Sequence, residues 1–267
     1  MLSQQQIDSY QTSGFLRVPR VFSAEEMNAM DEQLDYLMDQ WAQTEIGWTG
    51  PWRKVLMDAA TEEKSRLTSL HDLHFYSEAW MRAVTKPELC AALAQLLGSE
   101  NLELHHTTLH AKPPETGHPF PMHQDNAFYE HADDRYLDVL VHLDDTCHAN
   151  GEIRFLEGSH KSGALTHITK QADGVTCTPH LDTNAYRLDD TVPVPAKRGD
   201  VVMFNIFTIH GSYVNTTDKV RRLVRCGYRD PLNAQLSGQS IGRPNIMVKG
   251  VRIRAEEASA LTNEAVV

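Results

Sequence analysis

Apolar side chains in the first hundred residues repeat at helical spacing. After Ser23 they recur every three or four residues, which predicts one apolar stripe along a helix: Met27, Met30, Leu34, Leu37 and Trp41. Ser23 and Glu26 match a capping box, in which the hydroxyl accepts from the first turn and the glutamate reaches back to the backbone. Gly98 marks the end of a further helix. Residues 1–100 are therefore expected to form a mainly helical flank.

Beyond residue 100 the pattern changes to short apolar or alternating runs separated by turn residues. The runs span residues 102–111, 136–145, 152–158, 191–196, 200–210, 212–215 and 221–230. Short strands without helical periodicity between them predict an antiparallel sandwich or barrel. We expect one domain, mainly β with flanking helices (α+β), with residues 101–232 as the β core and 233–267 as a C-terminal extension. The polar run 174–191 predicts a long loop, of the kind that often forms a lid.

The composition of the chain limits the kinds of partner that the protein is expected to bind. The 267 residues carry a formal net charge of -11, which argues against a nucleic-acid surface because phosphate binding needs clustered Lys and Arg. The chain has no run of 18 apolar residues and no basic-then-apolar start, so we expect a soluble cytoplasmic protein without a membrane partner. The four cysteines lack CxxC spacing and are expected to be free thiols. Oligomeric state has no signature in the sequence.

Two histidines and one aspartate form a candidate metal site. In extended chain, residues i and i+2 share a face, so His123 and Asp125 can both point inward while Gln124 points away. His210 ends the apolar run 201–209, and Gly211 after it permits a sharp backbone turn. Two imidazoles and a carboxylate are the ligands of a mononuclear non-haem Fe(II) centre, which keeps positions open for a cosubstrate and O₂.

Other arrangements compete with this site, because the chain has fourteen histidines. His105 and His106 are adjacent and should face opposite sides of a strand. His71 and His74 have the spacing of a helical pair, without a nearby acid. A zinc hydrolase could also use two His and one Asp, but it would need a further acid or base to activate water.

An arginine near His210 favours a cosubstrate with a carboxylate. Strand alternation in residues 221–229 places two sets of side chains on opposite faces: Arg221, Leu223 and Arg225 on one, and Arg222, Val224 and Cys226 on the other. The planar fork of Arg221 can bind a carboxylate through two hydrogen bonds, which suits the distal carboxylate of 2-oxoglutarate. Ser212 could add a hydroxyl hydrogen bond to the same group.

Several ordered segments surround these residues. In chain order they are Lys112-Pro113-Pro114, Met122-His123-Gln124-Asp125, Asn150-Gly151, Gly158-Ser159-His160-Lys161, Lys197-Arg198-Gly199-Asp200 and His210-Gly211-Ser212, followed by Asn215 and Arg221. Together they resemble the phytanoyl-CoA dioxygenase-like branch of the Fe(II)/2-oxoglutarate oxygenases, over nearly the whole chain. Two positions depart from that pattern: Glu157 replaces a proline, and the segment Leu140-Val141-His142 lacks a common tryptophan.

The resemblance implies a double-stranded β-helix, the jelly-roll or cupin-like core. It also implies that His123, Asp125 and His210 bind Fe(II), and that O₂ and 2-oxoglutarate are consumed to give oxidised substrate, succinate and CO₂. The residues assigned to 2-oxoglutarate are Arg221, Ser212, Thr108 and Lys112. In related radical halogenases a small residue replaces the carboxylate ligand, so Asp125 favours hydroxylation of an unactivated C–H bond.

The substrate is expected to be a small metabolite. The residues assigned to it are Asn126, Phe128, Tyr129, Arg225 and Trp52. If Arg225 or the pair Arg53-Lys54 faces the cavity, an anionic compound such as a carboxylate, a phosphonate or an acyl-CoA is favoured. Two further alternatives are a non-catalytic cupin-like metabolite-binding protein, or a degenerate oxygenase that keeps the fold without turnover.

Overall fold

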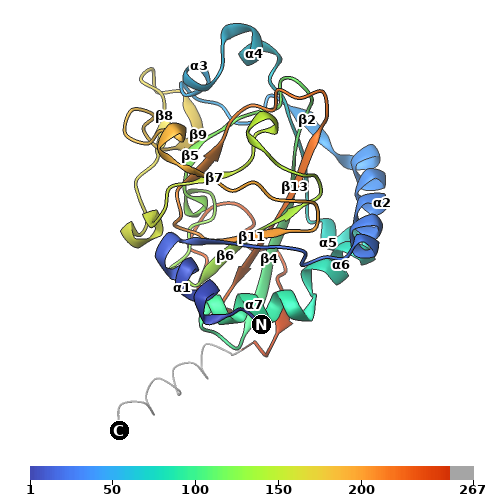
Figure 1. The fold of residues 1–267 in the computed structure, drawn as a ribbon. Coiled ribbons are helices and arrows are strands. Elements are labelled where there is room, and N and C mark those ends of the chain that lie inside the picture. Colours follow the sequence, from blue (N-terminus) through green and yellow to red (C-terminus); the bar gives the residue numbers. More distant parts are fainter. Residues whose placement is uncertain (253–267) are drawn as a thin grey trace.

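Two antiparallel sheets face each other at the centre of the computed structural model, which describes residues 1–252 (Figure 1). The larger sheet runs in the order β1 (Phe15–Val18), β11 (Val201–Asn205), β6 (Tyr136–His142), β13 (Arg221–Arg229), β4 (Leu102–Lys112), β3 (Leu67–His71) and β2 (Gln43–Glu45), and β14 (Ile246–Lys249) pairs with β4. The smaller sheet runs β10 (Val192–Pro193), β7 (Arg154–Phe155), β12 (His210–Ser212) and β5 (Phe120–His123). The predicted jelly-roll core is confirmed.

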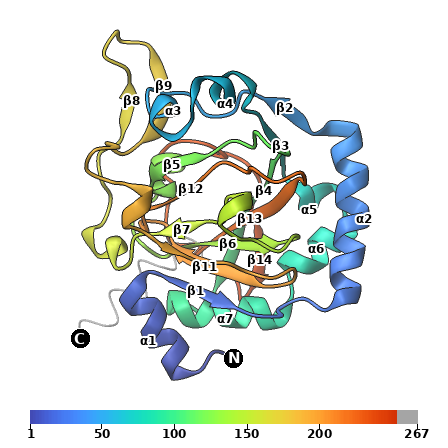
Figure 2. The ribbon, with the colours of Figure 1, turned by 45° about the horizontal axis from the view of Figure 1, so that its top comes forward.

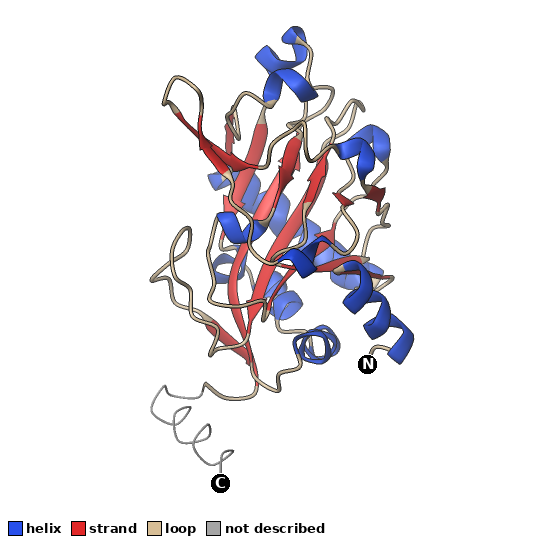
Figure 3. Ribbon diagram, turned by 90° about the vertical axis from the view of Figure 1, so that its left-hand side faces the viewer, coloured by secondary structure: helices blue, strands red, loops and turns tan. Residues whose placement is uncertain are grey.

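Five helices supply apolar side chains to the core on the outer face of the larger sheet, behind the long strands in Figure 3: α1 (Gln4–Ser13), α2 (Ala24–Trp41), α5 (Leu73–Tyr76), α6 (Glu78–Val84) and α7 (Pro87–Leu97). The short helices α3 (Arg53–Leu56) and α4 (Ala59–Lys64) lie at one end of the molecule, at the top of Figure 1. The 3₁₀ turns are η1 (Asp125–Ala127), η2 (His148–Asn150), η3 (Ser159–Ser162) and η4 (Leu188–Asp190). Within residues 1–252, none of the helices is long and apolar enough to cross a membrane.

Strand alternation divides the buried apolar side chains between two layers. On β6, Val139 and Val141 face the helices, whereas Leu140 faces the smaller sheet. On β13, Val224 packs towards the helices and Leu223 towards the smaller sheet. The period of two therefore gives each central strand one structural face and one face that can line a site.

The helical flank is less regular than its sequence suggested. The stripe on α2 is buried from Met27 to Leu37, but Trp41, in the last turn of the helix, is exposed. The flank also supplies β1, β2 and β3 to the larger sheet, so its residues share that sheet with the β core. His71 ends β3 and His74 lies in α5, so they are not a helical pair.

Three predictions about local structure, at His210, at Gly211 and in residues 174–191, were wrong. His210 begins β12 instead of ending a strand, because β11 stops at Asn205 and the chain crosses to the other sheet. Gly211 has no left-handed backbone; a Cβ there would lie 2.8 Å from the carbonyl oxygen of Phe120, so the glycine permits close strand packing. The run 174–191 contains β9 (Thr176–His180), which pairs with β8 (Ile168–Lys170) in a hairpin that projects from the core (Figure 2).

The directions of the His105 and His106 side chains also differ from those predicted. A bulge in β4 leaves His105 opposite the junction of Gly227 and Tyr228 on β13. Both imidazoles therefore turn towards one buried cluster, where their Nδ1 atoms lie 3.0 Å apart and His105 contacts the Tyr136 hydroxyl. Of the predicted C-terminal extension, β14 adds to the larger sheet, and residues 253–267 lie outside the described residues.

Replacing Ser23 with alanine is expected to lower the free energy of unfolding by about 1 kcal/mol. The Ser23 hydroxyl accepts from the backbone N–H of Glu26, and the Glu26 carboxylate accepts from the backbone N–H of Ser23 at 2.8 Å. Urea denaturation checks the value. Glu32→Ala, on the exposed side of the same helix, is the control and should change stability by less than about 0.5 kcal/mol.

Candidate metal and cosubstrate site

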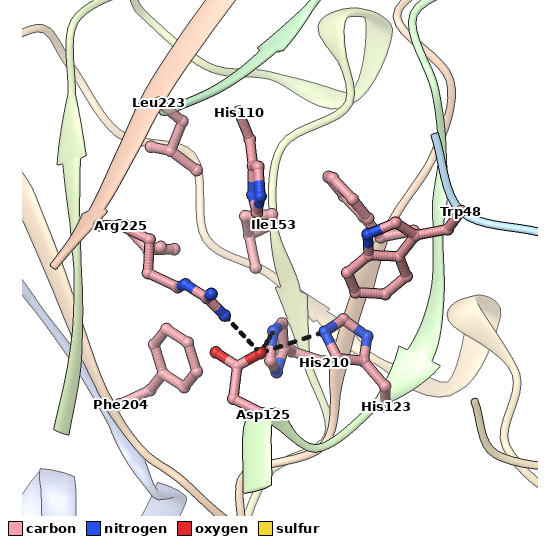
Figure 4. A pocket seen from close by; sticks show the side chains of 11 residues that line it. Trp48, His110, His123, Asp125, Ile153, Phe204, His210, Leu223 and Arg225 are labelled. Carbon is pink, nitrogen blue, oxygen red and sulfur yellow. Dashed lines mark ion pairs between the residues drawn. The ribbon is translucent and has the colours of Figure 1, made fainter. Parts of the chain in front are cut away.

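The structure brings His123, Asp125 and His210 together between the two sheets. His123 ends β5, Asp125 opens the turn η1, and His210 lies directly opposite His123 on β12. Asp125 Oδ1 is 3.5 Å from Nε2 of His123 and 3.9 Å from Nε2 of His210 (Figure 4). Gln124 points away and donates to the carbonyl oxygens of Gly163 and Phe207, which fixes the chain between the two ligands.

The hydrogen bonds around the two imidazoles leave one nitrogen of each for a metal. Nδ1 of His123 faces the Pro121 carbonyl at 2.7 Å, and Nδ1 of His210 faces the Thr208 carbonyl at 3.0 Å. A carbonyl can only accept, so Nδ1 carries the proton and Nε2 keeps its lone pair. Burial, followed by His123, lowers the pKa of His210 to about 3, which keeps that ring neutral.

Asp125 fits the role of an anionic metal ligand. Within residues 1–252 both of its oxygens are buried without a hydrogen-bond partner. Burial raises the pKa of the Asp125 carboxyl, but Arg225, His210 and His123 together hold it well below its ordinary value. A buried carboxylate that is ionised and not hydrogen-bonded is costly unless a cation occupies its free oxygens. The three donors therefore fit a divalent metal.

A second group of buried polar side chains lies on β13, β4 and β12. Arg221 is buried on β13 and donates from Nη2 to the Gly151 carbonyl at 3.1 Å, whereas its Nε and Nη1 have no hydrogen-bond partner within residues 1–252. Burial lowers the pKa of Arg221 to about 10, so it stays charged at neutral pH. Lys112 Nζ donates to the Ser212 hydroxyl at 2.7 Å. These groups fit a carboxylate that would accept from the free N–H donors of the guanidinium.

The position of Arg221 in the sheets differs from the predicted one. β13 belongs to the larger sheet and β12 to the smaller one, so Arg221 is not on a strand that neighbours the strand of His210. The predicted alternation of β13 is confirmed, because Leu223 and Arg225 line the cavity while Arg222 pairs with Asp144 on the other side.

Arg225 lies beside the candidate ligands. Its Nη1 is 2.8 Å from Asp125 Oδ1, although the angle does not make a hydrogen bond, and it donates to the Tyr129 hydroxyl at 2.9 Å. Tyr129 in turn donates to Asp138, whose carboxylate is 3.8 Å from Arg225 Nε. Burial, followed by Asp125, raises the pKa of Asp138, so Asp125 is the main counter-ion of Arg225.

The walls between these groups are mostly apolar and include residues that the sequence did not single out. They are Trp48, His110, Phe120, Leu140, Ile153, Phe204 and Leu223. Trp48 packs edge-on against His123, with ring centroids 4.7 Å apart, and contacts Phe128. Arg53 is buried and donates to the carbonyl oxygens of Ile46 and Trp48, so it holds the segment that carries this tryptophan.

The remaining assigned residues divide into two groups. Thr108 and Phe128 line a chamber next to the metal cavity, which places Thr108 on the side away from Arg221. Tyr129 lies behind Arg225, with its ring 5.0 Å from the guanidinium carbon. Asn126 and Trp52 do not line the cavity: Asn126 accepts from the backbone of His131, and Trp52 packs on His118.

A jelly-roll that holds two buried imidazoles, an ionised aspartate and a buried arginine defines the class of Fe(II)- and 2-oxoglutarate-dependent dioxygenases, and the predicted enzyme class is confirmed. The chain belongs to the phytanoyl-CoA dioxygenase (PhyH) family, whose model matches residues 10–223.

Relatives and solved structures agree with this family. The chain is 30% identical over 239 residues to a probable alpha-ketoglutarate-dependent hypophosphite dioxygenase of Stutzerimonas stutzeri, covering 85% of this chain and 78% of that protein. It is 29% identical to an ectoine dioxygenase of Bordetella parapertussis, covering 80% of this chain and 71% of that protein. The fold matches the non-heme alpha-ketoglutarate-dependent carbocyclase SnoK from nogalamycin biosynthesis with a TM-score of 0.73, 22% identity, and coverage of 90% and 89%.

Proposed function

We propose that this dioxygenase hydroxylates an unactivated C–H bond of a small, anionic metabolite. One oxygen atom of O₂ enters the substrate as a hydroxyl group, and the other enters succinate as 2-oxoglutarate loses CO₂. The observation that carries the proposal is the cluster of three buried side chains that could hold a metal, together with Arg221, a buried arginine whose Nε and Nη1 have no hydrogen-bond partner within residues 1–252.

Each polar group then has a separate task. His123, Asp125 and His210 would hold Fe(II), which supplies the activation of O₂ when it is bound. Arg221, Ser212 and Lys112 would hold the distal carboxylate of 2-oxoglutarate. The apolar walls, among them Phe204 and Leu223, exclude water from the reacting carbon and so limit side reactions.

The names of two relatives support a small substrate. One is named for hypophosphite, an anion, and another for ectoine. In this chain the cationic side chain that faces the same cavity is Arg225, which supports an anionic group in the substrate.

An anaerobic titration tests the proposal. Adding Fe(II) and then 2-oxoglutarate to the protein should produce a visible charge-transfer band, because the keto acid would chelate the metal. Glutarate is the matched control: it keeps both carboxylates, lacks the keto group and should give no band. Absence of the band at saturating 2-oxoglutarate, or no O₂-dependent succinate, would contradict the proposed function.

A further inference from the structure

Arg225 has more hydrogen-bonding capacity than its surroundings use. A guanidinium has five N–H donors. Within residues 1–252 the only hydrogen bond from Arg225 goes to the Tyr129 hydroxyl, and its Nε is buried without a partner. The residue is 8% exposed, so water satisfies little of this capacity. An unpartnered charged donor at this depth points to a ligand.

The ion pair with Asp125 does not explain Arg225 in the loaded enzyme. Asp125 lies near Nε2 of both candidate imidazole ligands, and its negative charge would be neutralised by Fe(II) when the metal is bound. Asp138 is 3.8 Å from Arg225 and already accepts from Tyr129. Once iron is bound, Arg225 is thus a buried cation whose nearest carboxylate is shared with a metal.

The chamber beside Arg225 has several polar side chains in its lining. Trp48, His110 and Arg225 line both this chamber and the metal cavity, so the two adjoin each other. Ser69, His71 and Thr108 add further polar groups, with His71 Nδ1 3.1 Å from the Thr108 hydroxyl. If the hydroxyl donates to Nδ1, the Nε2–H of His71 is left as a donor to a ligand.

The size and rim of the chamber restrict what can enter. Its volume is about 180 Å³, below the roughly 300–1,000 Å³ of pockets for drug-sized ligands. Glu45, from the exposed strand β2, lies at the rim and would repel a second anionic group. A long acyl chain with a polyphosphate carrier therefore does not fit this chamber.

Resting on the proposed function, we propose that the substrate is a short oxyanion, a carboxylate or a phosphonate, whose anionic group is bound by Arg225 together with His71 and Thr108. The closeness of Arg225 to Asp125 also limits which carbon can react. Because Arg225 Nη1 lies 2.8 Å from Asp125 Oδ1, an anionic group bound to this guanidinium would lie close to the residues that would hold Fe(II). The hydroxyl group therefore enters the carbon next to the anionic group or the one after it.

The experiment uses the Fe(II)- and 2-oxoglutarate-loaded protein and four probes: butanoate, butylphosphonate, the neutral analogue butanamide, and palmitoyl-CoA. The readouts are the anaerobic charge-transfer band and succinate released above the substrate-free background. We expect one or both of the short anions to shift the band and raise succinate release at least 10-fold over butanamide, and palmitoyl-CoA to do neither. Mass spectrometry of the product should place the hydroxyl on the first or second carbon from the anionic group.

Variants separate substrate binding from support of the metal. Arg225→Gln should weaken binding of the active anion about 30-fold or more, while the 2-oxoglutarate affinity changes less than about 3-fold. Arg225→Lys should recover part of the binding because it keeps the charge. Arg222→Gln, on the opposite face of β13, is the control and should leave both affinities unchanged.

Distinct outcomes overturn the two proposals. Without a charge-transfer band in the wild-type protein, the proposed function fails. If the band forms but butanamide acts as well as the anions, or if none of the probes shifts the band, the assignment of a short oxyanion fails and the enzyme class stands. If Arg225→Gln weakens iron or 2-oxoglutarate binding as much as anion binding, Arg225 is a positioning residue for Asp125 and the substrate assignment is wrong.

Discussion

Asp125→Asn is expected to reduce 2-oxoglutarate-dependent succinate formation by at least about 100-fold. Changing an outer partner of a metal ligand commonly costs 10–100-fold in metal affinity or activity, and the loss of the anionic ligand itself should exceed that range. The amide keeps the volume of the side chain, so the cavity walls stay in place. Fe(II) affinity, measured by anaerobic titration with the charge-transfer band, should fall together with turnover.

Two controls accompany Asp125→Asn. Asp39→Asn removes the same charge from the exposed face of α2 and should leave activity unchanged. Thermal unfolding of each variant shows whether the fold persists, because the substitution leaves Arg225 with Asp138 as its nearest carboxylate. A folded Asp125→Asn protein with full Fe(II) affinity and turnover would show that Asp125 is not a ligand.

Arg221→Gln is expected to raise the dissociation constant for 2-oxoglutarate by about 30-fold or more. Removing one partner of a buried charge pair costs roughly 2–5 kcal/mol, and each 1.4 kcal/mol is a factor of ten. Lys112 and Ser212 would remain, so binding should weaken without disappearing. The measurement is a 2-oxoglutarate titration of the Fe(II)-loaded protein.

The matched control is again Arg222→Gln, because Arg222 lies next to Arg221 but pairs with Asp31, Asp35 and Asp144 on the far face of β13. It should change the 2-oxoglutarate affinity by less than about 3-fold. Fe(II) affinity measured without cosubstrate should be similar in all three proteins. Equal 2-oxoglutarate affinity of Arg221→Gln and wild type would place the cosubstrate elsewhere in the cavity.

Local patterns predicted the parts of the fold and site that depend on nearest neighbours in the chain. The capping box at Ser23 and the alternation along β13 both follow from periodicities of one element, and both are present. The proximity of His123 and Asp125 follows in the same way from extended backbone. Alternation along β4 could also have identified His110, which shares a face with Thr108 and Lys112.

The features that the sequence did not predict depend on how segments distant in the chain pack together. Trp48 has no periodic neighbours to mark it, and it reaches the cavity because Arg53 binds the carbonyls of its loop. Trp52, four residues later, packs on His118 instead. The bulge at His105 arises from the register of β4 against β13, which no pattern within β4 alone encodes.

β13 carries Arg221 and Arg225 on one face, four residues apart, which is about 13 Å of extended chain. A strand with hydrogen-bonded neighbours on both sides, β4 and β6, cannot slip by one residue without turning both arginines to the opposite face of the sheet. If Arg221 and Arg225 bind the two anions as proposed, the backbone of β13 sets the separation between the cosubstrate anion and the substrate anion. The loop that carries Trp48 could then change the shape of the proposed substrate chamber without altering that separation.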